Sequence, residues 1–336
     1  MRLVQSEQRT MHLAYHDALT GISNRAHFED LLADMSVNAR KTGCSFALHC
    51  IDLDRFKELN DTHGHHIGDE LLRLVSTRLS SLCSQGETCA RLGGDEFAIL
   101  QSLDTESHAL AFGDAIVAKL SEPYELSVGT KTLGCSVGTV VSRSTVIAPL
   151  ELLRQADLAL YRAKEDGRNC HRTYDADMDA MLKTKRLLKD DLRADLMAGR
   201  LSMVYQPQVR LSGEVVGLEA LVRWTHAERG AISPSVFIPI AEDGGLIKLL
   251  GEFTLKQAAL DSRRWPHLKI AVNVAPAQLR SGEFPGLLAG CLEESGLAPC
   301  ALELELTEQV FLDGSKAQIR DTLQQIRAMG VTLAID

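Results

Sequence analysis

The sequence predicts two domains of mixed α and β structure, an α+β sandwich followed by a sheet or barrel of alternating strands and helices. A length of 336 residues is typical of two domains that each bury a core of their own. In the first half the predicted elements run helix–strand–helix–hairpin–helix–strand–helix, which favours an antiparallel-rich sheet with helices packed over it. In the second half strands and helices alternate, which favours a parallel sheet or barrel.

The predicted boundaries follow from where the apolar patterns start and stop. Residues 1–16 are expected to form a helix leading into the first domain, and residues 17–175 the domain itself. Residues 176–197 are expected to form a connecting helix that Gly199 ends, and residues 198–336 the second domain.

Composition narrows the class of protein. A hydrophobic fraction of 45% and a charged fraction of 24% are those of a soluble globular protein. The net charge of −9 argues against nucleic acid as a partner but permits small phosphorylated ligands. Eight cysteines without a C-x-x-C pair indicate reduced thiols and a cytoplasmic location. No apolar run approaches the ~20 residues of a membrane span, so we expect no membrane segment.

Apolar periodicity places the elements of the first domain. Phe28, Leu31, Leu32 and Met35 recur at helical spacing after a turn over residues 17–25. The run from Ser45 to Leu53 predicts a buried strand. The remaining predicted elements are a loop over 55–68, a helix that Asp69 opens, a hairpin around Gly93-Gly94, a helix over 109–120, a strand over 131–141 and a helix from Pro149 to Gly167.

Two acidic positions in this domain predict a cation site. Asp52 closes the apolar strand, and Asp95 follows the Gly93-Gly94 pair, whose tolerance of positive φ is typical of a tight hairpin turn. Side chains alternate along a strand, so Asp95 and Glu96 are expected on opposite faces of the sheet. If the two strands are neighbours, Asp52 and Asp95 suit a hard cation such as Mg²⁺ that bridges to phosphates.

Each of these features also has a structural interpretation. An exposed hairpin with solvated acids explains the diglycine stretch equally well when that stretch is taken alone. Asp69 complements a helix dipole, while Lys164 and Arg168 either satisfy carbonyls at a helix end or form a cationic pair for phosphate. The second acidic strand, which ends at Asp52, favours a ligand-binding site over the structural interpretation.

Four blocks of sequence, over roughly residues 14–175, resemble the GGDEF domain of diguanylate cyclases. The blocks are Asp52-Leu53-Asp54-Arg55-Phe56-Lys57-Glu58-Leu59-Asn60-Asp61, His65-x-x-Gly68-Asp69, Gly93-Gly94-Asp95-Glu96-Phe97 and Ala156-Asp157-x-Ala159-Leu160-Tyr161-x-Ala163-Lys164-x-x-Gly167-Arg168-Asn169. The resemblance implies a nucleotidyl-cyclase-like fold of the palm, or ferredoxin-like, type. It also implies condensation of two GTP into cyclic di-GMP and pyrophosphate by a homodimer, because each domain binds one GTP.

The resemblance further implies roles for individual residues. Asp52, Asp95 and the Leu53 carbonyl would hold Mg²⁺, with Mn²⁺ as an alternative. Asp95, Glu96 and Lys57 would form the catalytic set, in which Glu96 helps to deprotonate the attacking 3′-hydroxyl. The implied GTP-binding residues are Phe56, Asn60, Asp69, Gly93, Gly94, Lys164 and Arg168, with Asn60 and Asp69 at the guanine edge and Lys57, Lys164 and Arg168 at the triphosphate.

One departure from the family concerns feedback. The family's product-inhibition site is an Arg-x-x-Asp motif that ends shortly before the diglycine, and the corresponding residues here are Ser84 and Glu87. Without the arginine we predict weak or absent inhibition by cyclic di-GMP through this position.

In the second domain polar residues collect on predicted strands. The strands are expected at 201–209, 215–224, 270–274, 301–306 and 331–336, with helices at 253–265 and 316–329 between them. Glu219, Asn273, Glu305 and Asp336 are interpreted as strand-end residues. Solvation explains any one of them, but four together predict a metal site at the mouth of a barrel.

This domain resembles the EAL domain of cyclic di-GMP phosphodiesterases, a TIM-like barrel. The matching stretches are Tyr205-Gln206-Pro207, Glu219-Ala220-Leu221-x-Arg223-Trp224, Phe237-Ile238-Pro239-x-Ala241-Glu242, Asn273-Val274-Ala275 and Glu305-Leu306-Thr307-Glu308, with Ala275 replacing the usual Ser. The resemblance implies that Glu219, Asn273, Glu305 and Asp336 ligate metal and that Gln206 and Arg223 contact cyclic di-GMP. Because the family pattern continues beyond Asp336, we expect an incomplete barrel from a longer protein and no phosphodiesterase activity in this chain.

The sequence is therefore compatible with three functions. The first is a diguanylate cyclase joined to an incomplete phosphodiesterase domain. The second is a parent protein that is mainly a phosphodiesterase, with the GGDEF domain as a GTP-binding regulator. The third is a non-enzymatic scaffold that responds to cyclic di-GMP or GTP. Intact acids at Asp52 and Asp95 favour the first, because a pure regulator could lose them.

Overall fold

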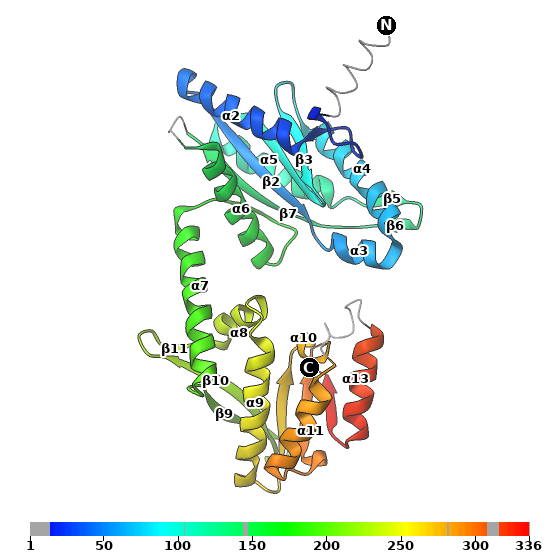
Figure 1. Ribbon diagram of the computed structural model, residues 1–336, viewed down its shortest axis with the longest axis vertical. Helices are drawn as coiled ribbons and strands as arrows, with labels where there is room; N and C mark the ends of the chain where they lie inside the picture. Colours follow the sequence, from blue (N-terminus) through cyan, green and yellow to red (C-terminus); the bar gives the residue numbers. More distant parts are fainter. Residues whose placement is uncertain (1–13, 104, 144–146, 281, 308–315, 336) are drawn as a thin grey trace. The chain divides into compact units, whose positions relative to one another are not determined.

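The computed structural model describes residues 14–103, 105–143, 147–280, 282–307 and 316–335 (Figure 1). Contacts between residues divide the chain into two compact units, Met1–Met181 and Leu182–Asp336, and each is described by itself. Most of the helix predicted over residues 1–16 lies outside the described residues. Among the helices that are described, none combines the length and apolarity that a bilayer crossing requires.

The first unit is built on a six-stranded sheet of order β1-β3-β4-β2-β7-β8. Neighbours among β2, β3, β4 and β7 are antiparallel, whereas β1–β3 and β7–β8 are parallel, as expected for an antiparallel-rich sheet. The strands are β1 (Ser23–Asn24), β2 (Ser45–Leu53), β3 (Thr88–Gly93), β4 (Glu96–Leu103), β7 (Cys135–Ser142) and β8 (His171–Thr173), with a separate hairpin of β5 (Tyr124–Leu126) and β6 (Gly129–Lys131).

Helices cover both faces of this sheet. The helices are α2 (Arg25–Thr42), α3 (Phe56–His63), α4 (His65–Leu82), α5 (Glu106–Leu120) and α6 (Pro149–Glu165). Leu48 and Cys50 of β2 pack with α2 and α6, while Ile51 and Leu53 pack with α4 and α5. Burial on both faces explains why β2 is an almost continuous apolar run.

Two predictions about this unit are wrong. The segment 55–68 is not a loop but α3 and the start of α4, joined at Gly64 with φ 87°. Buried Phe56 and Leu59 stabilise α3 by tertiary packing, which outweighs the polar, glycine-containing sequence. The strand predicted over 131–141 begins only at Cys135, because Lys131 belongs to the β5–β6 hairpin.

The second unit contains a mixed sheet of order β11-β10-β12-β13-β14, with β9 paired to β10. The β10–β12, β12–β13 and β13–β14 pairs are parallel as predicted, but β9 and β11 run antiparallel to β10. The strands are β9 (Ser202–Val209), β10 (Val215–His226), β11 (Gly230–Ile232), β12 (Lys269–Val274), β13 (Leu302–Leu306) and β14 (Thr332–Ile335).

One face of this sheet packs against helices. Those helices are α8 (Pro234–Asp243), α9 (Ile247–Asp261), α10 (Pro276–Leu279), α11 (Phe284–Ser295) and α13 (Lys316–Ala328), and Figure 1 shows α9, α11 and α13 running alongside the strands. Helix α7 (Ala176–Met197) occupies the range predicted for a connecting helix. Its Leu188, Leu192 and Leu196 are buried with Trp224 and Phe237.

Candidate functional site

The turn between β3 and β4 presents the diglycine segment. Gly93 pairs with Glu96, so the two loop residues are Gly94 and Asp95 rather than the glycines themselves. Gly93 and Gly94 have φ values of 146° and 53°, a left-handed range that side chains disfavour. The hairpin is confirmed, but Asp95 lies in its turn, so the strand alternation used to place Asp95 and Glu96 on opposite faces of the sheet does not apply to Asp95.

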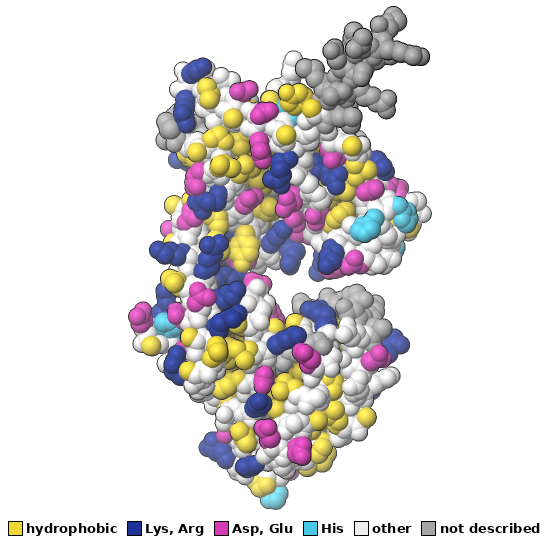
Figure 2. Space-filling model, in the orientation of Figure 1, with side chains coloured by type: hydrophobic (Ala, Val, Ile, Leu, Met, Phe, Trp, Pro, Cys, Tyr) yellow, Lys and Arg dark blue, Asp and Glu magenta, His cyan; other side chains and the backbone are white. Residues whose placement is uncertain are grey.

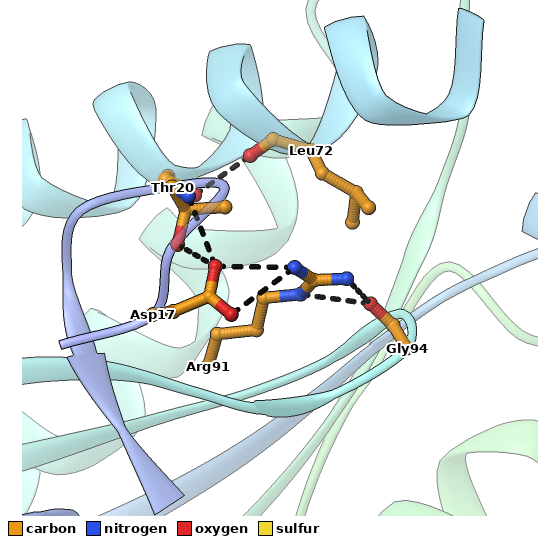
Figure 3. Close-up of polar contacts among 6 residues, drawn as sticks. Asp17, Thr20, Leu72, Arg91 and Gly94 are labelled. Carbon is orange, nitrogen blue, oxygen red and sulfur yellow. Dashed lines mark hydrogen bonds and ion pairs between the residues drawn. The ribbon is translucent and has the colours of Figure 1, made fainter. Parts of the chain in front are cut away.

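Arg91 fixes this turn (Figure 3). Its Nε and Nη2 donate to the Gly94 carbonyl at 3.0 and 2.8 Å, and its Nη1 lies 3.1 Å from Oδ1 of Asp17. Thr20 donates to Asp17 through both its backbone N–H and its hydroxyl. Burial opposes ionisation of Asp17, but the hydrogen bonds from Thr20 and Arg91 outweigh it and lower its pKa. This Asp17–Arg91 pair is not apparent from the sequence, because the partners lie 74 positions apart in the chain.

The predicted metal acids lie side by side. Strands β2 and β4 are neighbours, Asp52 stands opposite Glu96, and the Leu53 N–H donates to the Asp95 carbonyl at 3.3 Å. Lys164 of α6 places its Nζ 2.7 Å from Oδ2 of Asp52. Burial raises the pKa of Asp52, the Lys164 ion pair opposes that rise, and the Asp95 carboxylate adds to it. A cation at this point would relieve the repulsion between the two acids.

Glu96 faces a different set of partners. Directly opposite residues of an antiparallel pair share a face, so Glu96 and Asp52 point toward the layer of α2 and α6. Arg25 at the start of α2 lies 3.6 Å from Glu96 and also donates to the Leu92 carbonyl. Asp157 of α6 lies in the same environment, and its pKa is raised by burial and, less strongly, by Glu96.

The residues predicted to contact guanine gather around Gly68. A Cβ at Gly68 would lie 2.0 Å from Oδ1 of Asn60 and 3.1 Å from the ring of Phe56. Asn60 Oδ1 is buried and has no hydrogen-bond partner among the described residues. Asp69 follows Gly68 in the second turn of α4, so the prediction that it opens the helix is wrong. A buried amide oxygen that lacks a hydrogen bond is a group that a polar ligand can satisfy.

The remaining predicted phosphate-binding residues lie on two segments. Lys57 is exposed on α3, and Arg168 is exposed with φ 64° after α6. Buried Asp54 holds this second segment, because its carboxylate accepts from the backbone N–H of Asn169 and from the hydroxyl of Ser136, both at 2.8 Å. This role of Asp54 was not predicted, although an acid two residues beyond Asp52 was a signal in the sequence.

The protein supplies only some of the oxygen ligands that a hard cation requires. Asp52, Asp95 and the Leu53 carbonyl are the predicted oxygen ligands, and no cluster of three His, Cys, Asp or Glu side chains forms among the described residues. A magnesium ion keeps several ligands from water and substrate phosphate, so two carboxylates beside a cationic Lys164 are compatible with it.

Ser84 and Glu87 lie in the turn before β3. The Ser84 N–H donates to Oε2 of Glu87 at 2.7 Å, and the Glu87 N–H donates to the Ser84 carbonyl at 3.1 Å. Both residues are therefore used to close their own turn, and neither supplies a guanidinium.

A second polar cluster lies on the sheet of the second unit. Asn273 Nδ2 donates to Oε1 of Glu219 at 2.8 Å, and Gln208 Nε2 donates to Oε1 of Glu305 at 3.1 Å. Asn273 and Glu305 are register partners on β12 and β13. These polar residues therefore share the sheet face that α9, α11 and α13 leave open.

The structure corrects some details of this cluster. Glu219 lies within β10 rather than at its end, because the strand continues to His226 to pair with β11. Gln206 stands opposite Glu219 in register, and Arg223 Nη1 donates to the Val222 carbonyl. Asp336 lies outside the described residues. Gln208 was missed, although it lies two residues after Gln206 and so on the same face.

Surface charge is mixed. On the face that Figure 2 shows, basic and acidic side chains are interspersed rather than separated into regions of one sign. With a net charge of −9, this surface offers no broad basic region on that face for a nucleic-acid backbone.

Comparison with known proteins agrees with this architecture. Residues 14–170 match the family described as "Diguanylate cyclase, GGDEF domain", and residues 189–336 match the family "EAL domain". The bifunctional diguanylate cyclase/cyclic di-GMP phosphodiesterase MucR of Pseudomonas aeruginosa is 34% identical over 99% of this chain and 50% of its own length. The cyclic di-GMP phosphodiesterase PdeR of Escherichia coli is 33% identical over the same shares.

The chain spans about half or less of the length of the curated relatives that it matches. Among solved structures, the S helix-GGDEF-EAL portion of Vibrio cholerae LapD superimposes with a TM-score of 0.66 at 17% identity, covering 100% of this chain and 79% of that one. That likeness concerns the fold. The chain comprises a GGDEF domain followed by an EAL domain.

Proposed function

We propose that the first unit is a diguanylate cyclase, which condenses two GTP into cyclic di-GMP and pyrophosphate with a divalent metal ion. The observation that carries this proposal is the pairing of β2 with β4, which brings Asp52 beside Asp95 and next to Lys164. An acid pair kept beside a lysine, at a turn of glycines that a ligand can approach, has no evident value for packing.

Different residues of the unit would have different roles in phosphoryl transfer. Asp52, Asp95 and the Leu53 carbonyl would hold Mg²⁺ or Mn²⁺, which when bound offsets phosphate charge. Lys164, Lys57 and Arg168 would bind the triphosphate, and Lys164 would exchange its contact with Asp52 for one with phosphate. Asn60 and Asp69 would orient guanine.

Glu96 is proposed to accept the proton of the 3′-hydroxyl. In the free protein it lies near Arg25, which holds the carboxylate without burying it. Because one unit binds one GTP, the reaction requires two units facing each other, so we propose that a homodimer is the active form.

The test is GTP turnover by the full chain in Mg²⁺, with products separated by chromatography at several protein concentrations. We expect cyclic di-GMP as product and a specific activity that rises with protein concentration, since dimerisation is second order. Asp95→Ala should abolish turnover, whereas Asp61→Asn, an exposed acid on α3, should leave it within about twofold. Turnover that survives Asp95→Ala, or its absence in the folded wild type, would refute the proposal.

A second candidate activity rests on the cluster of Glu219, Asn273 and Glu305. Three oxygen-bearing side chains linked across β10, β12 and β13 suit a divalent ion, and PdeR, a relative, is a phosphodiesterase. In this alternative the longer parent protein mainly hydrolyses cyclic di-GMP and the GGDEF domain regulates it by binding GTP. Hydrolysis of cyclic di-GMP to pGpG by the parent protein, lost in Glu219→Ala, with no GTP turnover, would favour it.

A further inference from the structure

The segment that follows α6 has an unusual backbone. Gly167, Arg168 and Asn169 have φ values of 109°, 64° and 46°, so three successive residues lie in the left-handed range. A residue with a Cβ atom adopts this range at a cost in free energy, and the conformation persists only where the surrounding structure imposes it. The same segment carries Arg168, an exposed residue that is proposed to bind the triphosphate.

Asp54 gives this backbone a fixed point. The residue is only 7% exposed, and both of its carboxylate oxygens are used within the protein. Oδ1 accepts from the hydroxyl of Ser136 and Oδ2 accepts from the backbone N–H of Asn169, both at 2.8 Å. A hydrogen bond from a backbone N–H to a carboxylate is strong and directional, so it fixes the peptide group that joins Arg168 to Asn169.

Neighbouring contacts leave the segment little room. The Asp54 N–H donates to the Gly134 carbonyl at 3.0 Å, and a Cβ at Gly134 would lie 2.7 Å from Oδ1 of Asn169. The Arg168 N–H donates to the carbonyl of Ala163, in the last turn of α6, at 3.1 Å. The segment is therefore held between the end of β2, the residue before β7 and the end of α6.

The same carboxylate ties this segment to the predicted metal acids. Asp54 directly follows β2, which carries Asp52, and its partner Ser136 stands opposite Asp52 on β7. The two acids have different partners, since Asp52 is paired with Lys164 whereas Asp54 binds a hydroxyl and a backbone N–H. Asp54 therefore links the strand end at the metal site to the backbone that carries Arg168.

We propose that Asp54 is a positioning residue for the triphosphate, which holds Arg168 in place relative to the metal acids through the N–H of Asn169. This inference rests on the proposed binding of GTP at the site. Asp54 itself touches neither phosphate nor metal, and it acts by accepting hydrogen bonds rather than through its charge. An asparagine can replace it, because its oxygen accepts from Asn169 while its NH₂ donates to the hydroxyl of Ser136, which is also an acceptor.

The test is the affinity of the full chain for a non-hydrolysable GTP analogue, measured by calorimetry with Mg²⁺, which requires no turnover. Asp54→Ala should weaken binding of the analogue by about tenfold, the effect of losing a hydrogen bond to a charged group. Binding of GMP, which lacks the two outer phosphates, should not change. Asp54→Asn should restore most of the affinity for the analogue, which a role for the charge of Asp54 would not allow.

Ser136→Ala is a second variant, needed because loss of the Asp54 carboxylate can unfold the unit. It removes one of the two bonds that orient Asp54 and should weaken binding of the analogue by a smaller factor. Ser142→Ala is the matched control, since Ser142 is buried on the same strand but at its other end, and it should bind the analogue as the wild type does. In an Arg168→Ala background neither Asp54→Ala nor Ser136→Ala should weaken binding further, because the residue that they position is absent.

The inference is overturned if folded Asp54→Ala, or Ser136→Ala where the former does not fold, binds the analogue as tightly as the wild type. It is also overturned if Asp54→Asn loses as much affinity as Asp54→Ala, if the losses persist without Arg168, or if the folded wild type does not bind the analogue. Binding that depends on Asp54 without formation of cyclic di-GMP would refute the cyclase and keep this inference. Turnover with binding that is independent of Asp54 would do the reverse.

Discussion

Gly68→Ala is expected to weaken GTP binding without removing any group proposed to touch GTP. The added Cβ would lie 2.0 Å from Oδ1 of Asn60, more than an ångström closer than van der Waals contact permits, and 3.1 Å from the ring of Phe56. The Asn60 side chain must move away from its present position, which is the proposed guanine site, whereas the Phe56 ring must give by only a few tenths of an ångström.

The size of the effect follows from what is lost. One hydrogen bond to a neutral group contributes about 0.5–1.5 kcal/mol, which corresponds to a rise of roughly twofold to tenfold in the KM for GTP. The rate at saturating GTP should change less, because the acids at the metal site do not move. Overpacking should also lower the free energy of unfolding of the first unit by about 1–3 kcal/mol.

Two assays are needed to separate binding from chemistry. Initial rates of pyrophosphate release against GTP concentration give KM and kcat, and calorimetry with a non-hydrolysable GTP analogue gives affinity. Gly290→Ala is the matched control, since Gly290 is also helical but has no atom within 4 Å of the added Cβ. In an Asn60→Ala background only the 3.1 Å approach to the Phe56 ring remains, so Gly68→Ala should then have little further effect on KM. A folded Gly68→Ala protein with unchanged KM and affinity would refute the reasoning.

Three further predictions concern charge. Lys164→Ala removes the ion pair that lowers the pKa of Asp52 in the free protein, so that pKa rises and the acidic limb of the kcat/KM profile, which reports the free protein, should move to higher pH; an unmoved limb contradicts this. Asp17→Asn should lower the unfolding free energy by about 1–3 kcal/mol through loss of the Arg91 pair. Because the folded pKa of Asp17 lies below 3.8, its stabilisation is present above pH 3.8 and is lost as pH falls through the folded value, so wild type and variant should converge in acid denaturation curves. Cyclic di-GMP should not inhibit the cyclase through Ser84, and inhibition at low micromolar product that disappears in Ser84→Ala would disprove this.

Motif spacing was enough to select Asp52 and Asp95 as candidate site residues of the first unit. Asp52 at the end of a buried run and Asp95 beside a diglycine turn are visible because acids and glycines are unusual next to continuous apolar strands. The adjacency of β2 and β4 was only a condition in that prediction. The structure supplies it through eight register pairs from Ser45↔Leu103 to Asp52↔Glu96.

Prediction was weaker where tertiary contacts decide local structure. Residues 56–68 carry polar side chains, three histidines and two glycines, and their sequence favours a loop. They are helical because Phe56, Leu59 and Ile67 pack into a core that α4, β2 and β4 form. Local helix propensity does not reveal this packing. The same limit applies to Gln208, whose contact with Glu305 spans 97 positions.

The sequence by itself determined which residue types are present for chemistry and which segments are apolar enough to be strands and helices. Only the tertiary structure decided which of those residues meet: Arg91 with Asp17, Lys164 with Asp52 and Asn60 with Gly68. The physical reason is that side-chain contacts depend on sheet order and on how closely helices approach. Both are set by burial of the whole core and not by neighbours along the chain.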